Sequence, residues 1–162
     1  MRIIKYKRRR NKKTDYKARM NLLKSGLPRL IIRKTNRYLI AQIIISENAQ
    51  DKTIAHINSK ELKKHGWPIK FGNLAAAYLT GFLLGKKYLK NKNTKKIVLD
   101  LGIQRSTKGS KIYAVVKGII DSGVNIPCGK EILPTEERIN MGYKNKEIKN
   151  IIETIKKEAD KK

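Results

Sequence analysis

The sequence predicts an α/β fold in which a mixed sheet carries helices on its faces. Residues 29–58 hold three β-rich segments joined by short polar turns, a pattern typical of an antiparallel β-meander. Between residues 73 and 126, two apolar helical patterns then alternate with two short apolar strands. Because helices that alternate with strands cover the faces of a sheet, a meander followed by an αβαβ order predicts a mixed sheet.

The chain begins with a basic arm that has no strand pattern. Residues 1–13 lack an apolar period after Ile4, and we expect them to be extended or disordered. Thr14-Asp15 can cap a short helix over residues 16–23. A Ser-Gly pair and a following proline end this helix.

The meander is predicted as strands at residues 29–34, 38–46 and 52–58. All three segments are rich in isoleucine, leucine or threonine, and the third shows partial alternation of apolar and polar residues. Residues 35–37 form a candidate tight turn, and residues 47–51 form a polar turn.

A long helix is predicted over residues 73–89, after an irregular stretch at 59–71. Its apolar residues recur at spacings of three and four, and its alanines and glycines would let it lie close to a sheet. Three aromatic residues here fit core positions better than a base-stacking platform: Trp67, Tyr78 and Phe82.

The second half of the domain repeats the strand-helix order. Residues 97–101 form a nearly continuous apolar run, typical of a buried parallel strand. A second helix is expected over residues 111–122, with a glycine at its C-terminal cap. A last strand follows at residues 124–126, and residues 145–158 can form a polar C-terminal helix.

Charge is concentrated toward the N-terminus. The chain of 162 residues carries a net charge of +26. Residues 1–37 contribute +14, residues 38–130 contribute +11 and residues 131–162 only +1. Burying an unpaired Lys or Arg is too costly, so these side chains must face water or a polyanion. Nucleic acid is the favoured partner, and a generic DNA-compacting or membrane-surface polycation stays an alternative.

These patterns divide the chain into three parts. Residues 1–27 form a basic N-terminal RNA-binding arm with a short helix, residues 28–130 an α/β domain, and residues 131–162 a polar C-terminal tail with a helix. The longest apolar stretch is about half of what a bilayer requires, so we expect no membrane partner. The single cysteine, Cys128, cannot form an internal disulfide and favours a reducing, cytoplasmic compartment.

The arm supplies the first candidate RNA contacts. Basic side chains there would neutralise phosphates, with a tyrosine stacking on bases or sugars; the alternatives are a solvated tail or a targeting signal. The candidate residues are Lys7, Arg8, Arg9, Arg10, Lys12, Lys13, Tyr16 and Arg19.

The charge continues into the domain at the first strand and the turn after it. The strand supplies Arg29, and the turn combines cations with the neutral hydrogen-bonding groups of Thr and Asn, which suits an irregular RNA backbone. The alternative is an ordinary hairpin turn with solvated charges. The candidate RNA contacts in this turn are Arg33, Lys34, Thr35, Asn36 and Arg37.

A third candidate lies between the buried strand at 97–101 and the next helix. The free N–H groups of a helix start favour an anion, but the loop lacks the GxxxxGK[ST] spacing, so nucleotide binding is not expected. RNA contact and a plain polar loop both fit. The candidate contacts are Arg105, Lys108 and Lys111.

A metal-dependent nuclease is the competing enzymatic hypothesis. It would use Asp100 and Asp121, but a two-metal site needs several clustered carboxylates, and the core segments offer only these two. His56 and His65 are isolated and lack metal-ligand spacing. We therefore predict no catalytic residue, no metal and no cofactor.

Several sequence blocks occur in an order that is more specific than any one of them. They lie between about residue 5 and residue 140: Tyr6 to Arg10, Thr14 to Arg19, Pro28 to Leu30, Arg33 to Tyr38, Gly72 to Gly81, Leu101 to Gly109, Ala114 to Gly118, and Leu133 to Ile139. Together they resemble the archaeal and eukaryotic ribosomal protein L-eighteen family (eukaryotic L-five), which binds 5S rRNA.

The resemblance implies a fold related to the ribonuclease H-like mixed sheet and a role that is not enzymatic. Members clamp 5S rRNA, dock it in the central protuberance of the large subunit, and touch the large rRNA and neighbouring ribosomal proteins. The resemblance implies RNA contacts by the arm around Arg8–Arg10, by Tyr16 and Arg19, and by the turn at 33–37. The absence of a long C-terminal extension favours an archaeal-type protein.

Overall fold

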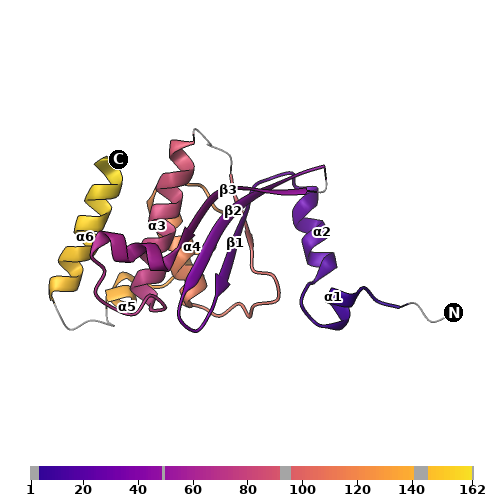
Figure 1. Cartoon of the computed structure of the whole chain (residues 1–162), viewed down its shortest axis with the longest axis horizontal. Helices are drawn as coiled ribbons and strands as arrows, with labels where there is room; N and C mark the ends of the chain where they lie inside the picture. Colours follow the sequence, from indigo (N-terminus) through magenta and orange to yellow (C-terminus); the bar gives the residue numbers. More distant parts are fainter. Residues whose placement is uncertain (1–3, 49, 92–95, 141–145, 162) are drawn as a thin grey trace.

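A computed structural model describes residues 4–48, 50–91, 96–140 and 146–161 (Figure 1). Its strands are β1 (Arg29–Lys34), β2 (Leu39–Glu47), β3 (Gln50–Asn58) and β4 (Val98–Asp100). Its helices are α1 (Lys7–Arg10), α2 (Tyr16–Lys24), α3 (Leu74–Lys90), α4 (Lys111–Asp121), α5 (Glu136–Asn140) and α6 (Lys146–Lys161), with 3-10 turns η1 (Ser59–His65) and η2 (Lys130–Ile132).

The four strands form one sheet in the order β3-β2-β1-β4. The β1–β2 and β2–β3 pairs are antiparallel, whereas β1 and β4 run parallel. The mixed sheet and the α/β class are therefore confirmed, and β1 has the predicted bounds. The relation to the ribonuclease H-like fold stays a prediction.

The predicted last strand at residues 124–126 is wrong. Among the described residues this segment belongs to no strand, and a hydrogen bond of 3.1 Å from the Ile97 amide to the Asn125 carbonyl ties it to the start of β4. Its apolar residues, Val124 and Ile126, are buried. They anchor the chain to the core, so their apolar character reflects packing and not membership of the ladder.

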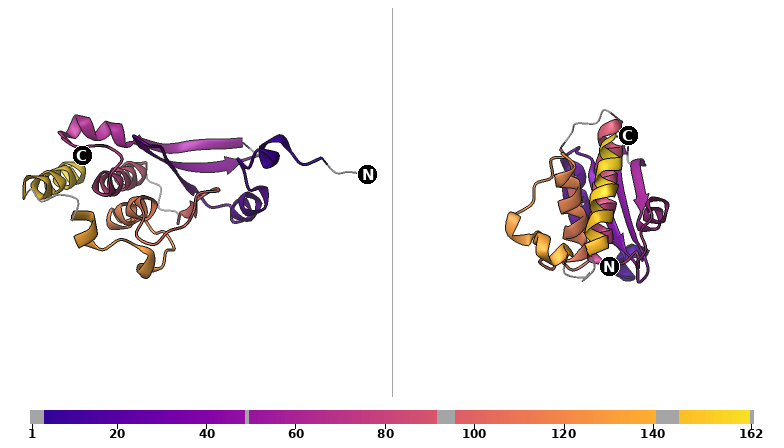
Figure 2. Two further views of the ribbon diagram at one scale, coloured as in Figure 1. Left: turned by 90° about the horizontal axis from the view of Figure 1, so that it is seen from below. Right: turned by 90° about the vertical axis from the view of Figure 1, so that its left-hand side faces the viewer.

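Helices α3 and α4 cover one face of the sheet, and α6 packs outside α3 (Figures 1 and 2). The inward residues of β1 and β2 alternate, with Leu30, Ile32 and Ile43 fully buried. The core placement of three aromatic residues is confirmed, because all are at most 5% exposed: Trp67, Tyr78 and Phe82.

The small residues of α3 serve helix-helix contact more than helix-sheet contact. A Cβ at Gly81 would meet the Val115 carbonyl of α4, and one at Gly118 would meet the Tyr78 carbonyl of α3. The glycines thus let the two backbones touch where any side chain would separate them. A Cβ at Gly85 would meet the side chain of Ser122, just after α4. The expectation that Gly81 and Gly85 bring this helix close to the sheet is therefore corrected: they bring it close to α4.

This close approach leads to a stability prediction. Gly118→Ala is expected to destabilise the fold by about 2–3 kcal/mol, because the added methyl meets backbone that cannot move aside. Gly129→Ala is the matched control, since a Cβ there finds its nearest neighbour at 3.8 Å. Urea unfolding of both variants checks it; equal midpoints would contradict the packing described.

The N-terminal segment is more ordered than predicted. Residues 7–10 form α1 where an extended tip is expected. Asp15 caps α2 as predicted, its Oδ1 accepting from the amides of Lys17 (3.0 Å) and Ala18 (3.1 Å).

The stretch at 59–71, predicted irregular, begins with η1, which the sequence pattern missed because a 3-10 turn lacks the helical period.

Candidate nucleic-acid interface

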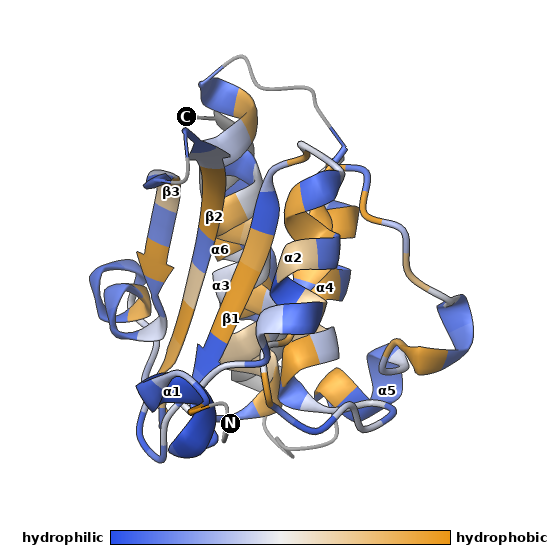
Figure 3. Cartoon of the chain, turned by 90° about the vertical axis from the view of Figure 1, so that its right-hand side faces the viewer, coloured by the Kyte–Doolittle hydropathy of each residue, from blue (hydrophilic) through white to orange (hydrophobic). Residues whose placement is uncertain are grey.

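A groove runs between the arm and α2 on one side and the end of β1 and the loop after β4 on the other. Five cationic side chains line it: Arg8, Lys13, Arg19, Arg33 and Lys34. The structure thus brings three of the predicted arm contacts and two of the predicted turn contacts onto one surface, which we call the basic groove. Figure 3 shows α1 coloured hydrophilic.

Arg33 is held at the edge of this groove. Its Nη1 donates to the Ile32 carbonyl at 3.1 Å, and Gln104 Nε2 donates to the same oxygen at 2.6 Å. Gly102 has φ +60°, and a Cβ there would lie 3.2 Å from the guanidinium of Arg33. The loop after β4 therefore packs against Arg33 and limits the directions in which this cation can point.

The described tip of the arm, residues 4–13, touches the residues after it through few side-chain contacts. Arg8 Nε donates to Thr14 Oγ1 at 2.9 Å, and the rings of Tyr6 and Tyr16 lie 5.4 Å apart. The remaining predicted arm contacts are exposed and open to a polyanion: Lys7, Arg9, Arg10, Lys12 and Lys13.

Two arginines near the groove are engaged within the chain. Arg29, only 1% exposed, reaches Asp51 at 2.8 Å and Asp100 at 3.0 Å. Arg19, with 43% of its side chain exposed, meets the other oxygen of Asp51 at 2.8 Å. The prediction that Arg29 belongs to the basic surface is wrong, because its guanidinium is buried against two carboxylates. Arg19 ties α2 to the start of β3.

The turn at residues 35–37 is closed by Thr35, whose Oγ1 accepts from the Tyr38 amide at 2.9 Å. Thr35, Asn36 and Arg37 are exposed. Asn36 and Arg37 lie beside Lys111, the first residue of α4, in a second hollow described below. Of the other loop candidates, Arg105 and Lys108 are exposed and line neither surface.

Comparison with known proteins decides the family. The family described as "Ribosomal large subunit proteins 60S L5, and 50S L18" matches residues 2–98 and 90–129. The chain belongs to this family. It is therefore grouped with structural proteins of the large ribosomal subunit and not with enzymes, and the resemblance stated from the sequence blocks is confirmed.

Three curated relatives carry the name large ribosomal subunit protein uL18, and all come from archaea. The Korarchaeum cryptofilum protein is 48% identical over 84% of this chain and 69% of its own length. The Caldivirga maquilingensis protein is 47% identical over 85% and 66%, and the Methanococcus maripaludis protein 44% over 97% and 79%. The archaeal type of this L5/L18 chain is confirmed.

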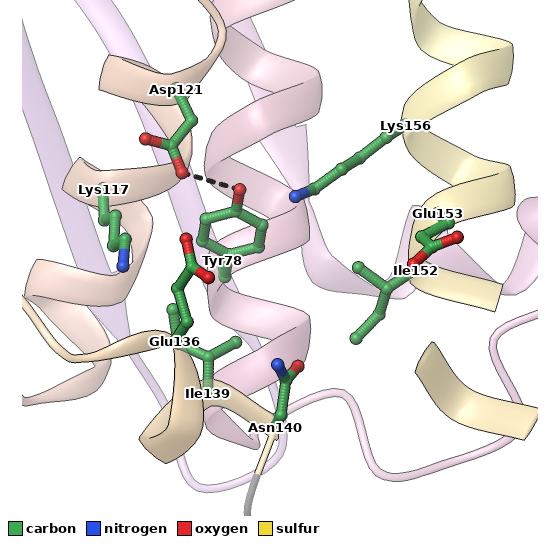
Figure 4. A pocket seen from close by; sticks show the side chains of 9 residues that line it. All are labelled: Tyr78, Lys117, Asp121, Glu136, Ile139, Asn140, Ile152, Glu153 and Lys156. Carbon is green, nitrogen blue, oxygen red and sulfur yellow. Dashed lines mark hydrogen bonds between the residues drawn. The ribbon is translucent and has the colours of Figure 1, made fainter. Parts of the chain in front are cut away.

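The carboxylates of the nuclease hypothesis are engaged elsewhere. Asp100 binds Arg29 and also accepts from the Gly102 amide at 2.9 Å. Asp121 accepts from the Tyr78 hydroxyl at 2.7 Å in a pocket beneath α6 (Figure 4). Burial, and then the bond to Asp121, raise the pKa of Tyr78, so its hydroxyl keeps the donated proton. Across the described ranges, no three His, Cys, Asp or Glu side chains gather as metal ligands.

The same pocket shows how the C-terminal helix is held. Lys156 of α6 points toward Tyr78 in Figure 4, and its Nζ lies 4.7 Å from the centre of the Tyr78 ring. Ile152 and Ile155 of α6 are buried. No helix in the described part of the chain has the length and apolarity to cross a bilayer.

Sequence reasoning missed four residues beside the turn: Tyr38, Lys70, Phe71 and Asn73 line the second hollow. Lys70 and Phe71 fall in a stretch predicted to be irregular, and Asn73 was predicted only to begin a helix. Tyr38 directly follows the turn, but the other three lie far from it in the sequence, which hides the contact. The run of a lysine, an aromatic residue and an amide at positions 70–73 was a signal that could have indicated a ligand site.

Proposed function

We propose that the chain binds 5S rRNA and helps attach it to the large rRNA, forming part of the central protuberance of the large subunit. The observation that carries this proposal is the basic groove, where arm and turn cations converge on one surface. Membership in a family of large-subunit proteins supports an RNA partner. Neighbouring ribosomal proteins of the protuberance are further partners, and the site of action is the cytoplasmic ribosome.

The proposed contacts divide into an adaptable and a fixed group. The arm residues at positions 7–13 make few contacts with the rest of the described chain and order on the RNA. Tyr16 and Arg19 on α2 and the turn at 33–37 on the sheet are already held by the fold and bind without rearrangement. The loop residues Arg105, Lys108 and Lys111 add separate RNA contacts near the start of α4. The division into an arm at 1–27, a domain at 28–130 and a tail at 131–162 is part of the proposal.

Binding of this kind is electrostatic and selective for RNA shape. The affinity for 5S rRNA should fall steeply with salt, with a slope of log K against log salt of roughly −4 to −7 for about six to eight phosphate contacts. At moderate salt, 5S rRNA should bind at least about tenfold more tightly than duplex DNA of equal length. Fluorescence anisotropy measures both.

These binding measurements, together with a cleavage assay, also distinguish the proposal from a generic polycation and from a nuclease. Equal affinity for 5S rRNA and duplex DNA at moderate salt would indicate a generic polycation and contradict the proposal. Mg²⁺-dependent cleavage of RNA that Asp100→Asn abolishes would indicate the nuclease instead.

A further inference from the structure

A second hollow, which we call the turn hollow, lies between the turn after β1 and the segment before α3. The residues that give it its chemistry are Arg37, Tyr38, Lys70, Phe71, Asn73 and Lys111. It shares no lining residue with the basic groove. It therefore needs an explanation of its own.

Gly72 brings the two walls of the hollow together. A Cβ at this position would lie 3.3 Å from the Arg37 carbonyl and 3.4 Å from the Asn36 carbonyl. Glycine lets the segment at 70–73 approach the turn this closely, whereas a side chain would have to push the turn back slightly. As a result, the flanking Phe71 and Asn73 face residues that are more than 30 positions earlier in the chain.

Asn73 lines this hollow and carries a side-chain amide of fixed orientation. Its Oδ1 caps α3 by accepting from the Ala76 amide at 2.6 Å, which fixes the orientation of the side-chain amide. Its Nδ2 is buried and finds no hydrogen-bond partner among the described residues. A buried donor without an acceptor costs about 1–3 kcal/mol, so the geometry favours a ligand that brings an acceptor.

The remaining lining groups specify what kind of ligand this is. Tyr38 and Phe71 are partly exposed, with ring centres 6.5 Å apart and planes tilted by 35°. Arg37, Lys70 and Lys111 are exposed around them. Aromatic faces stack on any base and cations neutralise phosphate, whereas a base edge offers acceptors to the Asn73 amide. A duplex hides its base faces, so it does not match this set.

We propose that the turn hollow receives one unpaired nucleotide of the RNA, its base against Phe71 or Tyr38 and an acceptor of that base on Asn73 Nδ2. The proposal rests on the proposed function and adds to it a place where the chain reads an unstacked base. The basic groove then supplies charge-driven affinity, and the turn hollow supplies preference for unpaired RNA.

The test uses full-length chains and 5S rRNA. Asn73→Asp keeps the capping oxygen, removes the donor and adds a negative charge. The unfolding temperature should not fall, because a carboxylate also caps a helix start, while RNA affinity should drop about tenfold. Phe71→Leu keeps apolar volume and removes the ring, with a loss of about five- to tenfold. Asn125→Asp adds the same charge just past the opposite end of α4, where it is exposed, and should stay within about twofold of wild type.

Asn73→Ser serves as an uncharged second variant, because serine also caps a helix but has no amide donor. Its loss should parallel that of Asn73→Asp. If all three hollow variants bind like wild type while substitutions in the arm weaken binding, the turn hollow is no binding site and the proposed function stands. If wild type prefers 5S rRNA no more than duplex DNA, both proposals fall.

Discussion

Arg29→Ala is expected to cost about 3 kcal/mol of unfolding free energy, the largest effect of any single substitution considered. The Arg29 side chain is 1% exposed and bridges Asp51 and Asp100. Its removal leaves Asp100, itself only 7% exposed, as a buried carboxylate without its cation, which typically costs 3–5 kcal/mol. The lower figure applies because the Gly102 amide still donates to Asp100. Urea denaturation followed by circular dichroism measures the loss.

Two further variants show whether the cost comes from the unpaired charge. Arg29→Met with Asp100→Asn removes both charges and should recover much of the stability lost in Arg29→Ala. Arg19→Ala should cost about 1 kcal/mol or less, because the Arg19–Asp51 pair is exposed to solvent. A loss below about 1 kcal/mol for Arg29→Ala would contradict a structural role for the buried network.

Neutralising the arm is expected to weaken binding of 5S rRNA by on the order of 100-fold near physiological salt. The variant changes five exposed cations to glutamine: Arg8, Arg9, Arg10, Lys12 and Lys13. If most of them meet phosphates, the salt slope should fall in magnitude by roughly 3. The fold should persist, because the described tip of the arm contacts later residues only through the Arg8–Thr14 hydrogen bond and the Tyr6–Tyr16 ring pair.

A matched control removes the same charge from elsewhere on the molecule. It changes to glutamine five exposed lysines that lie outside both proposed surfaces: Lys52, Lys63, Lys64, Lys90 and Lys157. This control should reduce affinity by less than about tenfold, since distant charges act through screened long-range attraction. Equal losses in the two variants would mean that the chain binds through net charge and not through the arm.

The parts of the fold that could be predicted are those that local patterns determine. The alternation of β1, the Asp15 cap of α2 and the apolar spacing of α3 and α4 all depend on residues within one or two turns of each other. The predicted strand at 124–126 was wrong because short apolar runs look alike whether they pair in a ladder or only anchor a loop.

The candidate site also divides into residues that could be predicted from local sequence and residues that could not. Exposed cations of the arm and the turn could be recognised from charge density alone. The burial of Arg29 could not, because its partners Asp51 and Asp100 lie 22 and 71 positions away and only the parallel β1–β4 pairing brings the second one near. The turn hollow was missed for the same reason: its two walls meet only in three dimensions.

A hydroxyl-radical footprint on 5S rRNA, with the intact chain and with the chain lacking residues 1–13, tests the central claim most directly. The account predicts that the intact chain protects one continuous region. Without residues 1–13, part of that region should lose protection, while the part that faces the turn at 33–37 stays protected. No protection by the intact chain, or the same footprint with and without residues 1–13, would contradict a basic groove built from both the arm and the turn.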